Sequence, residues 1–197
     1  MKRTLLSVVA ISTLFVVTGC TEKGAEESHL KVNFVNNSEI QNKGMGQIKG
    51  ILMKLKPTIK NSLTEDKTGL AGVEMCSTSA LEMGKAYNST LPKDSSIRRT
   101  AIKYRNPNNK PDATDIAVMN KFIESKEFKK PLVVEMDESF RVYKALPIMQ
   151  PCLACHGAKK DMNAKTVEMI NKKYPHDLAT DFKLGELRGV IISTIKK

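Results

Sequence analysis

The sequence predicts an α+β domain in which an antiparallel sheet is flanked by helices. Apolar residues recur at helical spacing in the first half of the chain. Short stretches rich in Val, Ile and Tyr follow in the second half, interrupted by a further helical pattern. Helices that come first and strands that follow favour an antiparallel sheet over the parallel sheet of alternating α/β folds. The chain has 197 residues and no internal repeat, which indicates one folded domain.

The first half is predicted to contain two helices. The first covers about 47–64, and Pro57 should kink it or split it in two. The second covers about 70–85, directly after a glycine. One face of this second helix carries residues spaced three, four and three positions apart, namely Val73, Cys76, Ala80 and Met83. This spacing predicts that Cys76 points inward among apolar neighbours.

The second half is predicted to supply the strands. Strand character is found over 97–104, 132–136, 140–148 and 186–195. The tripeptide Asp137-Glu138-Ser139 has the composition of a hairpin turn between the second and third of these stretches.

Two further helices are expected among the strands. Asp112 should cap a helix that runs to about Ser125, with Asp115 completing a capping box. The inward residues of this helix are expected to be Ile116, Met119 and Ile123. A last short helix is predicted over 163–173, ended by Pro175.

Residues 1–19 are predicted to be a lipoprotein signal peptide and not part of the fold. Lys2 and Arg3 precede a short apolar stretch, which Val17-Thr18-Gly19-Cys20 closes with small residues before a cysteine. This segment resembles a bacterial lipobox, in which Cys20 is lipid-modified and becomes the mature N-terminus. The alternatives are an ordinary signal peptide with an incidental cysteine and a short membrane anchor, although a spanning helix needs about 20 apolar residues.

A lipidated Cys20 predicts a protein that is held at a membrane in the periplasm. Thr21, and not an aspartate, follows the cysteine, which by resemblance to Gram-negative sorting rules favours the outer membrane. Residues 20–46 are polar with little periodicity and are predicted to be a flexible tether. The folded domain is therefore predicted over 47–197.

The pentapeptide Cys152-Leu153-Ala154-Cys155-His156 is the clearest functional motif. Its C-x-x-C-H spacing is typical of covalent haem c attachment, in which two thiols bond to the porphyrin and the histidine ligates the iron. A redox dithiol would need a βαβ context and a zinc site a second ligand pair, and the sequence shows neither. One covalent haem c is therefore expected, held by Cys152, Cys155 and His156.

Cys76 is the one cysteine that neither lipid nor haem attachment uses. An unpaired thiol in an oxidising compartment is a liability unless it is buried or has a function. A buried, inert thiol is the ordinary alternative, because free cysteine packs like a small apolar residue.

The charge balance limits the choice of partners. The net charge is +11, and removal of Lys2 and Arg3 with the signal peptide leaves +9. The basic residues are scattered without interleaved aromatic residues, so nucleic acid is not expected as a partner. Anionic lipid, an acidic redox partner and haem propionates are the alternatives, beside a merely solvated basic surface.

Several segments together resemble a family of single-haem c-type proteins with a PAS-like fold, long described as a domain of unknown function. The resemblance covers about 47–195, and its members occur as free-standing proteins and as periplasmic sensor modules. The segments that carry it are Gly72–Cys76, Arg98–Thr100, Lys103–Asp112, Pro151–Gly157, Tyr174–Asp177 and Gly185–Ile191. One departure is His176, where an acidic residue would be expected before Asp177.

The resemblance implies a PAS-like sheet with the haem held against it. It also implies that Cys76 is the distal iron ligand, so that His156 and Cys76 would bracket the iron. Competing distal ligands are methionines, namely Met75, Met83, Met119 and Met149. Arg98, Arg99 and Arg105 are candidates to pair with the haem propionates, because a guanidinium matches a carboxylate in a bidentate fork. Surface ion pairing is the alternative for each arginine.

Two functions follow from these expectations. In the first, the protein is a haem-based redox or gas sensor in which Cys76 detaches on reduction, admits CO, NO or another small ligand, and signals through a separate protein partner. In the second, it is a periplasmic electron carrier with permanent ligation. An enzyme is not expected, since only His29 and His176 remain as acid–base histidines. A homodimer is a further expectation, because PAS-like domains often dimerise.

Overall fold

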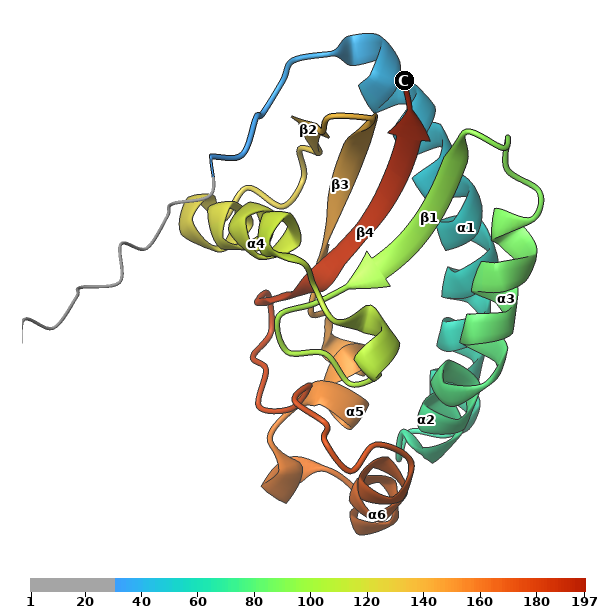
Figure 1. The fold of residues 1–197 in the computed structure, drawn as a ribbon. Helices are drawn as coiled ribbons and strands as arrows, with labels where there is room; N and C mark the ends of the chain where they lie inside the picture. The colour runs from blue at the N-terminus through green and yellow to red at the C-terminus, as the bar shows by residue number, and fades with distance from the viewer. Residues whose placement is uncertain (1–30) are drawn as a thin grey trace, which may run out of the picture.

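A four-stranded antiparallel sheet forms the centre of the molecule. The computed structural model describes residues 31–197. The strands lie in the order β1-β4-β3-β2 and every neighbouring pair is antiparallel (Figure 1). Their bounds are β1 Ser95–Thr100, β2 Leu132–Glu135, β3 Ser139–Pro147 and β4 Leu187–Lys196. β4 lies between β1 and β3 and is buried from Gly189 to Ser193, as expected for a central strand.

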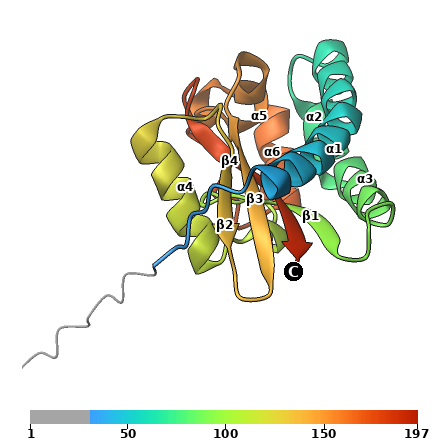
Figure 2. The same cartoon turned by 90° about the horizontal axis from the view of Figure 1, so that it is seen from above.

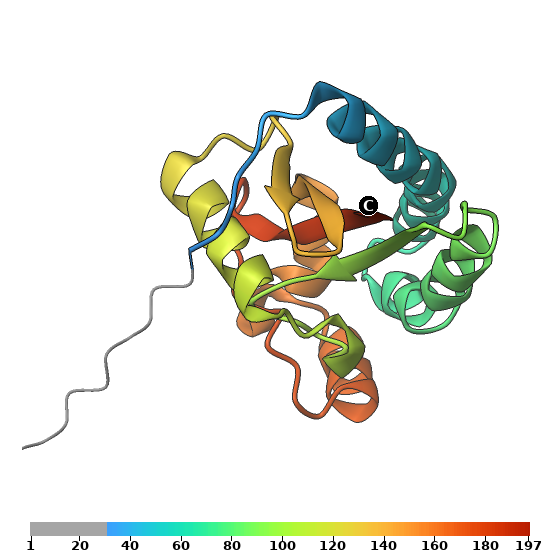
Figure 3. The ribbon, with the colours of Figure 1, turned by 45° about the horizontal axis from the view of Figure 1, so that its top comes forward.

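Helices cover both faces of this sheet, so the predicted α+β architecture is confirmed (Figures 1, 2 and 3). The α-helices are α1 Ser38–Glu65, α2 Leu70–Ser77, α3 Ser79–Asn88, α4 Ala113–Ser125, α5 Leu153–His156 and α6 Ala164–Lys173. Three short 3-10 helices are η1 Pro107–Asn109, η2 Gln150–Cys152 and η3 Lys159–Asp161. α1 and α3 cover one face and α4 the other, while α2, α5 and α6 gather beyond the end of the sheet where β4 begins (Figure 1).

Two apolar clusters hold the layers together. The first joins α1 to the sheet through Ile48, Ile51 and Leu55, which pack against Ile97, Val142 and Ile191. The second joins α4 to the opposite face through Val118, Met119 and Phe122, which pack against Tyr143, Val190 and Ile192. Alternate residues of β4 therefore serve opposite faces, as the period of a strand requires.

The first helix is longer than the sequence indicates, and it is not split in two. α1 begins at Ser38 with Asn37 as its cap, so residues 38–46 of the predicted tether are helical. Residues just before the helix also pair with β2, since Val35 N donates to Val133 O at 3.0 Å. The predicted break at Pro57 is wrong, because Pro57 lies exposed within one continuous helix. A proline removes one backbone hydrogen bond there, and the buried residues on the other side of α1 keep the helix on the sheet.

The second predicted helix is divided in two. α2 ends at Ser77 and α3 begins at Ser79, with Thr78 in a non-helical conformation between them. The hydroxyl of Thr78 donates to the Glu74 carbonyl at 2.9 Å, which satisfies the end of α2. Cys76 therefore lies in the last turn of α2, beside this break.

α4 forms as predicted but presents a different face. The capping box between Asp112 and Asp115 is present. Ile116 and Ile123 are exposed, however, and Val118 and Phe122 are buried in their place. The reason is Asp115, whose carboxylate points inward to bind charged and hydroxyl groups of the sheet and thereby sets the rotation of the helix.

Residues 1–19, Cys20 and the first part of the tether lie outside the described residues, so the export and lipidation predictions are not addressed by the structure. Among residues 31–197, no helix combines the length and apolar character needed to cross a bilayer.

Candidate haem site

The C-x-x-C-H motif lies on a single short helical turn at the end of the sheet. Pro151 lies within η2, whose last residue is Cys152, and α5 continues to His156. Cys155 is buried, and its thiol donates to the Gly69 carbonyl at 3.3 Å. Cys152 is half-buried and packs against a small cluster that includes Ile148 and Ala179. Both thiols are free, and the turn presents them together with the histidine.

The imidazole of His156 is held in one orientation by the backbone. Its Nδ1 lies 2.8 Å from the Ala179 carbonyl oxygen, which only accepts hydrogen bonds, so Nδ1 carries the proton. Phe182 packs edge-on against the ring at a centroid distance of 6.3 Å. Burial, with the charges of Arg188 and Arg105 as smaller causes, holds the pKa of His156 well below its usual value. The ring is therefore neutral at pH 7 and unprotonated at Nε2, which is the form that binds a metal.

Arg105 is engaged inside the protein. It forms a buried bidentate pair with Asp177, with Nε 3.1 Å from Oδ1 and Nη2 3.0 Å from Oδ2. The same Nη2 donates to the carbonyl oxygens of Cys155 at 2.7 Å and Ala179 at 3.2 Å. This guanidinium supports the backbone around the haem motif, which is a different role from the predicted pairing with a propionate.

The two adjacent arginines of β1 point to opposite faces of the sheet. Arg98 faces α4, where Nη2 lies 2.8 Å from the buried carboxylate of Asp115, so this residue is directed away from the motif. Arg99 faces the other way, and its charge acts on Cys76, His156 and Arg188. Within residues 31–197, Arg99 has no carboxylate at ion-pair distance, and it is the one predicted propionate partner that is still available.

Arg188 is a site residue that the sequence did not single out. Its Nε lies 3.5 Å from His156 Nε2, and its Nη1 donates to the Lys103 carbonyl at 3.0 Å. Burial, then repulsion from Arg105 and Arg99, lowers the pKa of Arg188 to about 10. Arg188 belongs to a segment that carried the family resemblance. Its contact with His156 could not be predicted from the sequence, because it depends on the start of β4 lying next to α5 in the folded chain.

The structure brings Cys76 into the same electrostatic environment as His156. Burial raises the pKa of the Cys76 thiol, and the nearby charges of Arg99, Arg105 and Arg188 oppose this effect. The side chain is half-buried and packs against the apolar cluster beneath α1. The prediction that Cys76 points inward is confirmed.

The competing methionines differ in position. Met119 belongs to the cluster on the α4 face, and Met149 has 58% of its surface exposed. Met75 and Met83 pack in the cluster under α1 together with Cys76. Position alone therefore favours the residues of α2 and α3 over the other two methionines.

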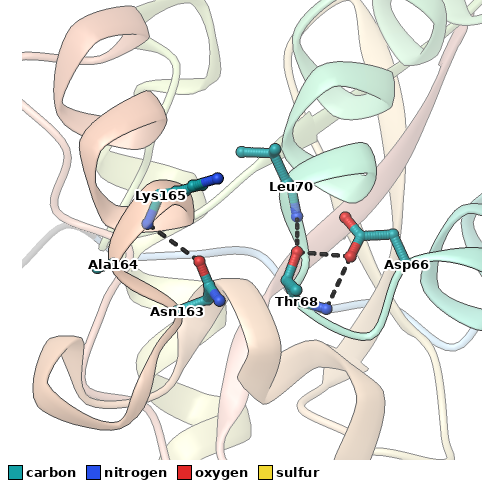
Figure 4. A pocket seen from close by; sticks show the side chains of 6 residues that line it. All are labelled: Asp66, Thr68, Leu70, Asn163, Ala164 and Lys165. Atoms are coloured by element: carbon teal, nitrogen blue, oxygen red, sulfur yellow. Dashed lines mark hydrogen bonds between the residues drawn. The ribbon is translucent and has the colours of Figure 1, made fainter.

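Two surface hollows flank the haem motif without including its ligands. One, of about 510 Å³, lies between the turn before α2 and the start of α6, where Asp66, Thr68 and Asn163 line it (Figure 4). Its polar groups satisfy one another locally, since Asp66 accepts from Thr68 and Asn163 accepts from the Lys165 backbone (Figure 4). The other, of about 1020 Å³, follows the outer side of α5 along Leu153, Ala154 and Phe182.

The donor set fits a covalent haem with two anionic propionates. Two free thiols and a neutral imidazole lie on one turn. Arg99, Arg105 and Arg188 surround this turn, and Asp177 is the one carboxylate within residues 31–197 that pairs with any of them. An iron bound to Nε2 would require the Arg188 side chain to turn aside, which a long flexible side chain permits.

Comparison with known proteins agrees with this geometry. The family model described as Tll0287-like matches residues 23–196. The chain belongs to the Tll0287-like family. The fold is similar to the crystal structure of the cyanobacterial haem protein Tll0287, with a TM-score of 0.63 and 25% sequence identity. That match covers 83% of this chain and 98% of the other.

No protein with a curated description matched the chain. The family that the sequence motifs indicated is confirmed by the family match and by the solved structure. The family match begins at residue 23, well before the predicted domain start at 47, and it includes the first part of α1.

Proposed function

We propose that this Tll0287-like protein is a monohaem c-type cytochrome in which Cys152 and Cys155 attach the haem and His156 ligates the iron. The observation that carries the proposal is the state of His156, whose Nδ1 is hydrogen-bonded to the Ala179 carbonyl so that Nε2 is unprotonated. The haem content of Tll0287 supports the same assignment. A bound haem supplies an iron that exchanges one electron and takes two axial ligands.

Cys76 is the proposed second axial ligand. It lies in the last turn of α2, close enough to Arg99, Arg105 and Arg188 for their charges to act on its thiol. A thiolate donor favours ferric over ferrous iron, so reduction weakens the hold of Cys76 on the metal. The break at Thr78 leaves α2 as a separate short helix that could respond when Cys76 detaches.

The biological role proposed is a redox or diatomic-gas sensor. Detachment of Cys76 would admit CO, NO or another small ligand, and a separate protein partner would receive the signal. Export, lipidation at Cys20 and attachment to the outer membrane of a Gram-negative bacterium complete the proposal and rest on the sequence motifs. A homodimer is proposed on the behaviour of PAS-like domains, and neither catalysis nor nucleic-acid binding is part of the role.

Visible spectroscopy of the purified protein tests this function. A thiolate-type ferric spectrum that changes on reduction and then binds CO supports the sensor. A six-coordinate spectrum in both oxidation states that is inert to CO would leave the alternative, a periplasmic electron-transfer cytochrome. Failure to bind haem after expression with a working maturation system would contradict the whole assignment.

A Cys76→Ala variant decides the ligand. The ferric spectrum should lose its thiolate character, whereas a Met83→Leu control should keep it. An unchanged spectrum in Cys76→Ala together with a changed one in Met83→Leu would assign Met83 as the ligand.

A further inference from the structure

Asp177 and Arg105 form a support that reaches His156 through the backbone of one residue, Ala179. Asp177 Oδ1 accepts from the Ala179 amide at 2.8 Å, and the Ala179 carbonyl accepts from His156 Nδ1 at 2.8 Å. Arg105 Nη2 donates to the same carbonyl at 3.2 Å. The backbone of Ala179, whose carbonyl orients the histidine, is therefore held at its N–H by Asp177 and at its carbonyl by Arg105.

Arg105 also binds the backbone of the haem motif directly. Arg105 Nη2 donates to the carbonyl of Cys155, the residue directly before His156, at 2.7 Å. The Arg105 guanidinium therefore binds on both sides of the His156 hydrogen bond. It contacts the helix that carries the donor ring, and it contacts the carbonyl that accepts the hydrogen bond. A planar fork suits this task, because it holds several acceptors in fixed directions.

The Arg105–Asp177 ion pair is buried. The side chain of Arg105 is 11% exposed and that of Asp177 is 2% exposed. Backbone hydrogen bonds also hold the segment 178–182 that contains Ala179. Phe182 N donates to His156 O at 3.0 Å, and Leu178 N donates to Tyr104 O at 3.1 Å. Removal of one partner would leave the other as a buried, unpaired charge.

We infer that Arg105 and Asp177 are positioning residues that set the tautomer and the orientation of the His156 imidazole through the backbone of Ala179. The inference rests on the proposed function in one respect, since His156 is taken to be an iron ligand. The histidine geometry itself does not depend on a bound haem, and this allows the two ideas to be tested separately.

The first test uses the haem-free full chain with its thiols reduced. The ¹⁵N chemical shifts of the His156 ring report which nitrogen carries the proton at pH 7. The wild type should show the proton on Nδ1, and Asp177→Asn and Arg105→Gln should both shift toward a mixture of the two tautomers. Lys43→Gln, which removes only an exposed ion pair with Asp94, is the control and should match the wild type.

Arg105→Lys separates charge from geometry. A lysine keeps the charge but loses the fork, so the mixed tautomer pattern should persist in this variant. A wild-type pattern in Arg105→Lys and Arg105→Gln alike would overturn the inference, as would a wild-type chain with its proton on Nε2. Amide spectra of each variant show whether it is folded, and Asp177→Glu supplies a conservative replacement if Asp177→Asn is not.

The second test uses the haem-loaded protein in a Cys76→Ala background. The ferrous iron–histidine stretching band reports the strength of the Nδ1 hydrogen bond, and it should fall in Asp177→Asn, in Arg105→Gln and in the double variant. A pure charge effect predicts opposite shifts for the single variants and recovery in the double variant, which would overturn the inference. If the protein bound no haem, the proposed function would be contradicted. The tautomer measurement on the haem-free chain would still decide this inference.

Discussion

Arg188 Nε lies 3.5 Å from His156 Nε2, the ring nitrogen that the Ala179 carbonyl leaves free. Arg188 donates to this nitrogen, but its positive charge has no carboxylate partner within residues 31–197, and burial disfavours that charge. The proposed haem supplies one, since its propionates would give Arg188 and Arg99 the anionic partners that residues 31–197 do not provide. Four predictions follow from this arrangement and from the packing around it.

Replacement of Arg188 by Gln should lower the midpoint potential of the haem. A positive charge near the iron would stabilise the ferrous state, and its loss at an effective dielectric constant near 20 is expected to be worth on the order of 1 kcal/mol or more. Potentiometric titration measures the shift. Arg98→Gln is the matched control on the other face and should change the potential little, so equal shifts in the two variants would contradict a specific role for Arg188.

Replacement of Cys152 and Cys155 by Ser should abolish covalent haem attachment. Each thioether requires a thiol at that position, and neither thiol is committed to a disulfide. Denaturing electrophoresis with haem staining detects the covalent product. Cys76→Ser should keep the stain, because Cys76 is proposed to ligate the iron and not to bond to the porphyrin; a covalent haem in the double Ser variant would refute the attachment.

Gly69→Ala should destabilise the folded chain and hinder haem attachment. Gly69 has φ of +90°, and an added Cβ would lie 2.9 Å from both the Cys155 sulfur and the Ala154 carbonyl oxygen. A left-handed conformation alone costs a non-glycine residue about 1–2 kcal/mol. Denaturant unfolding measures the loss, and Gly84→Ala in α3 is the control.

The Gly84→Ala control should be neutral or stabilising. A Cβ at Gly84 meets nothing within 4 Å, and alanine is favoured over glycine in a helix by about 1 kcal/mol. Comparable destabilisation in both variants would show that the close approach of Gly69 to α5 is not the cause.

Asp115→Asn should strongly destabilise the fold without altering the haem spectrum. The carboxylate is fully buried and binds Arg98 at 2.8 Å, Arg141 at 3.4 Å and the Tyr143 hydroxyl at 3.0 Å. Loss of one partner from a buried ion pair costs about 3–5 kcal/mol. Denaturant unfolding checks the magnitude, and a change in the haem spectrum would contradict the separation of this cluster from the site.

An exposed ion pair provides the comparison for Asp115. Asp94 and Lys43 are each more than two-fifths exposed and lie 3.0 Å apart. Asp94→Asn should lower the free energy of unfolding far less than Asp115→Asn, because solvent screens such pairs.

Local patterns were enough to predict much of the secondary structure. The capping box at Asp112 and Asp115 and the hairpin turn before Ser139 depend on residues close in sequence, and both formed as expected. Pro57 did not split the helix, because packing of α1 on the sheet outweighs the local preference of one exposed proline. The inward face of α4 was predicted incorrectly, because a buried carboxylate decided its rotation.

The sequence by itself determined the haem motif, the family and the succession of helices and strands, because these depend on spacing along the chain. The tertiary structure decided the contacts of the arginines. Alternation along β1 sent Arg98 to one face and Arg99 to the other. The segment after α6 folds back so that Asp177 pairs with Arg105. The start of β4 brings Arg188 into contact with His156. Such contacts join residues 32 to 72 positions apart, and only folding brings them together.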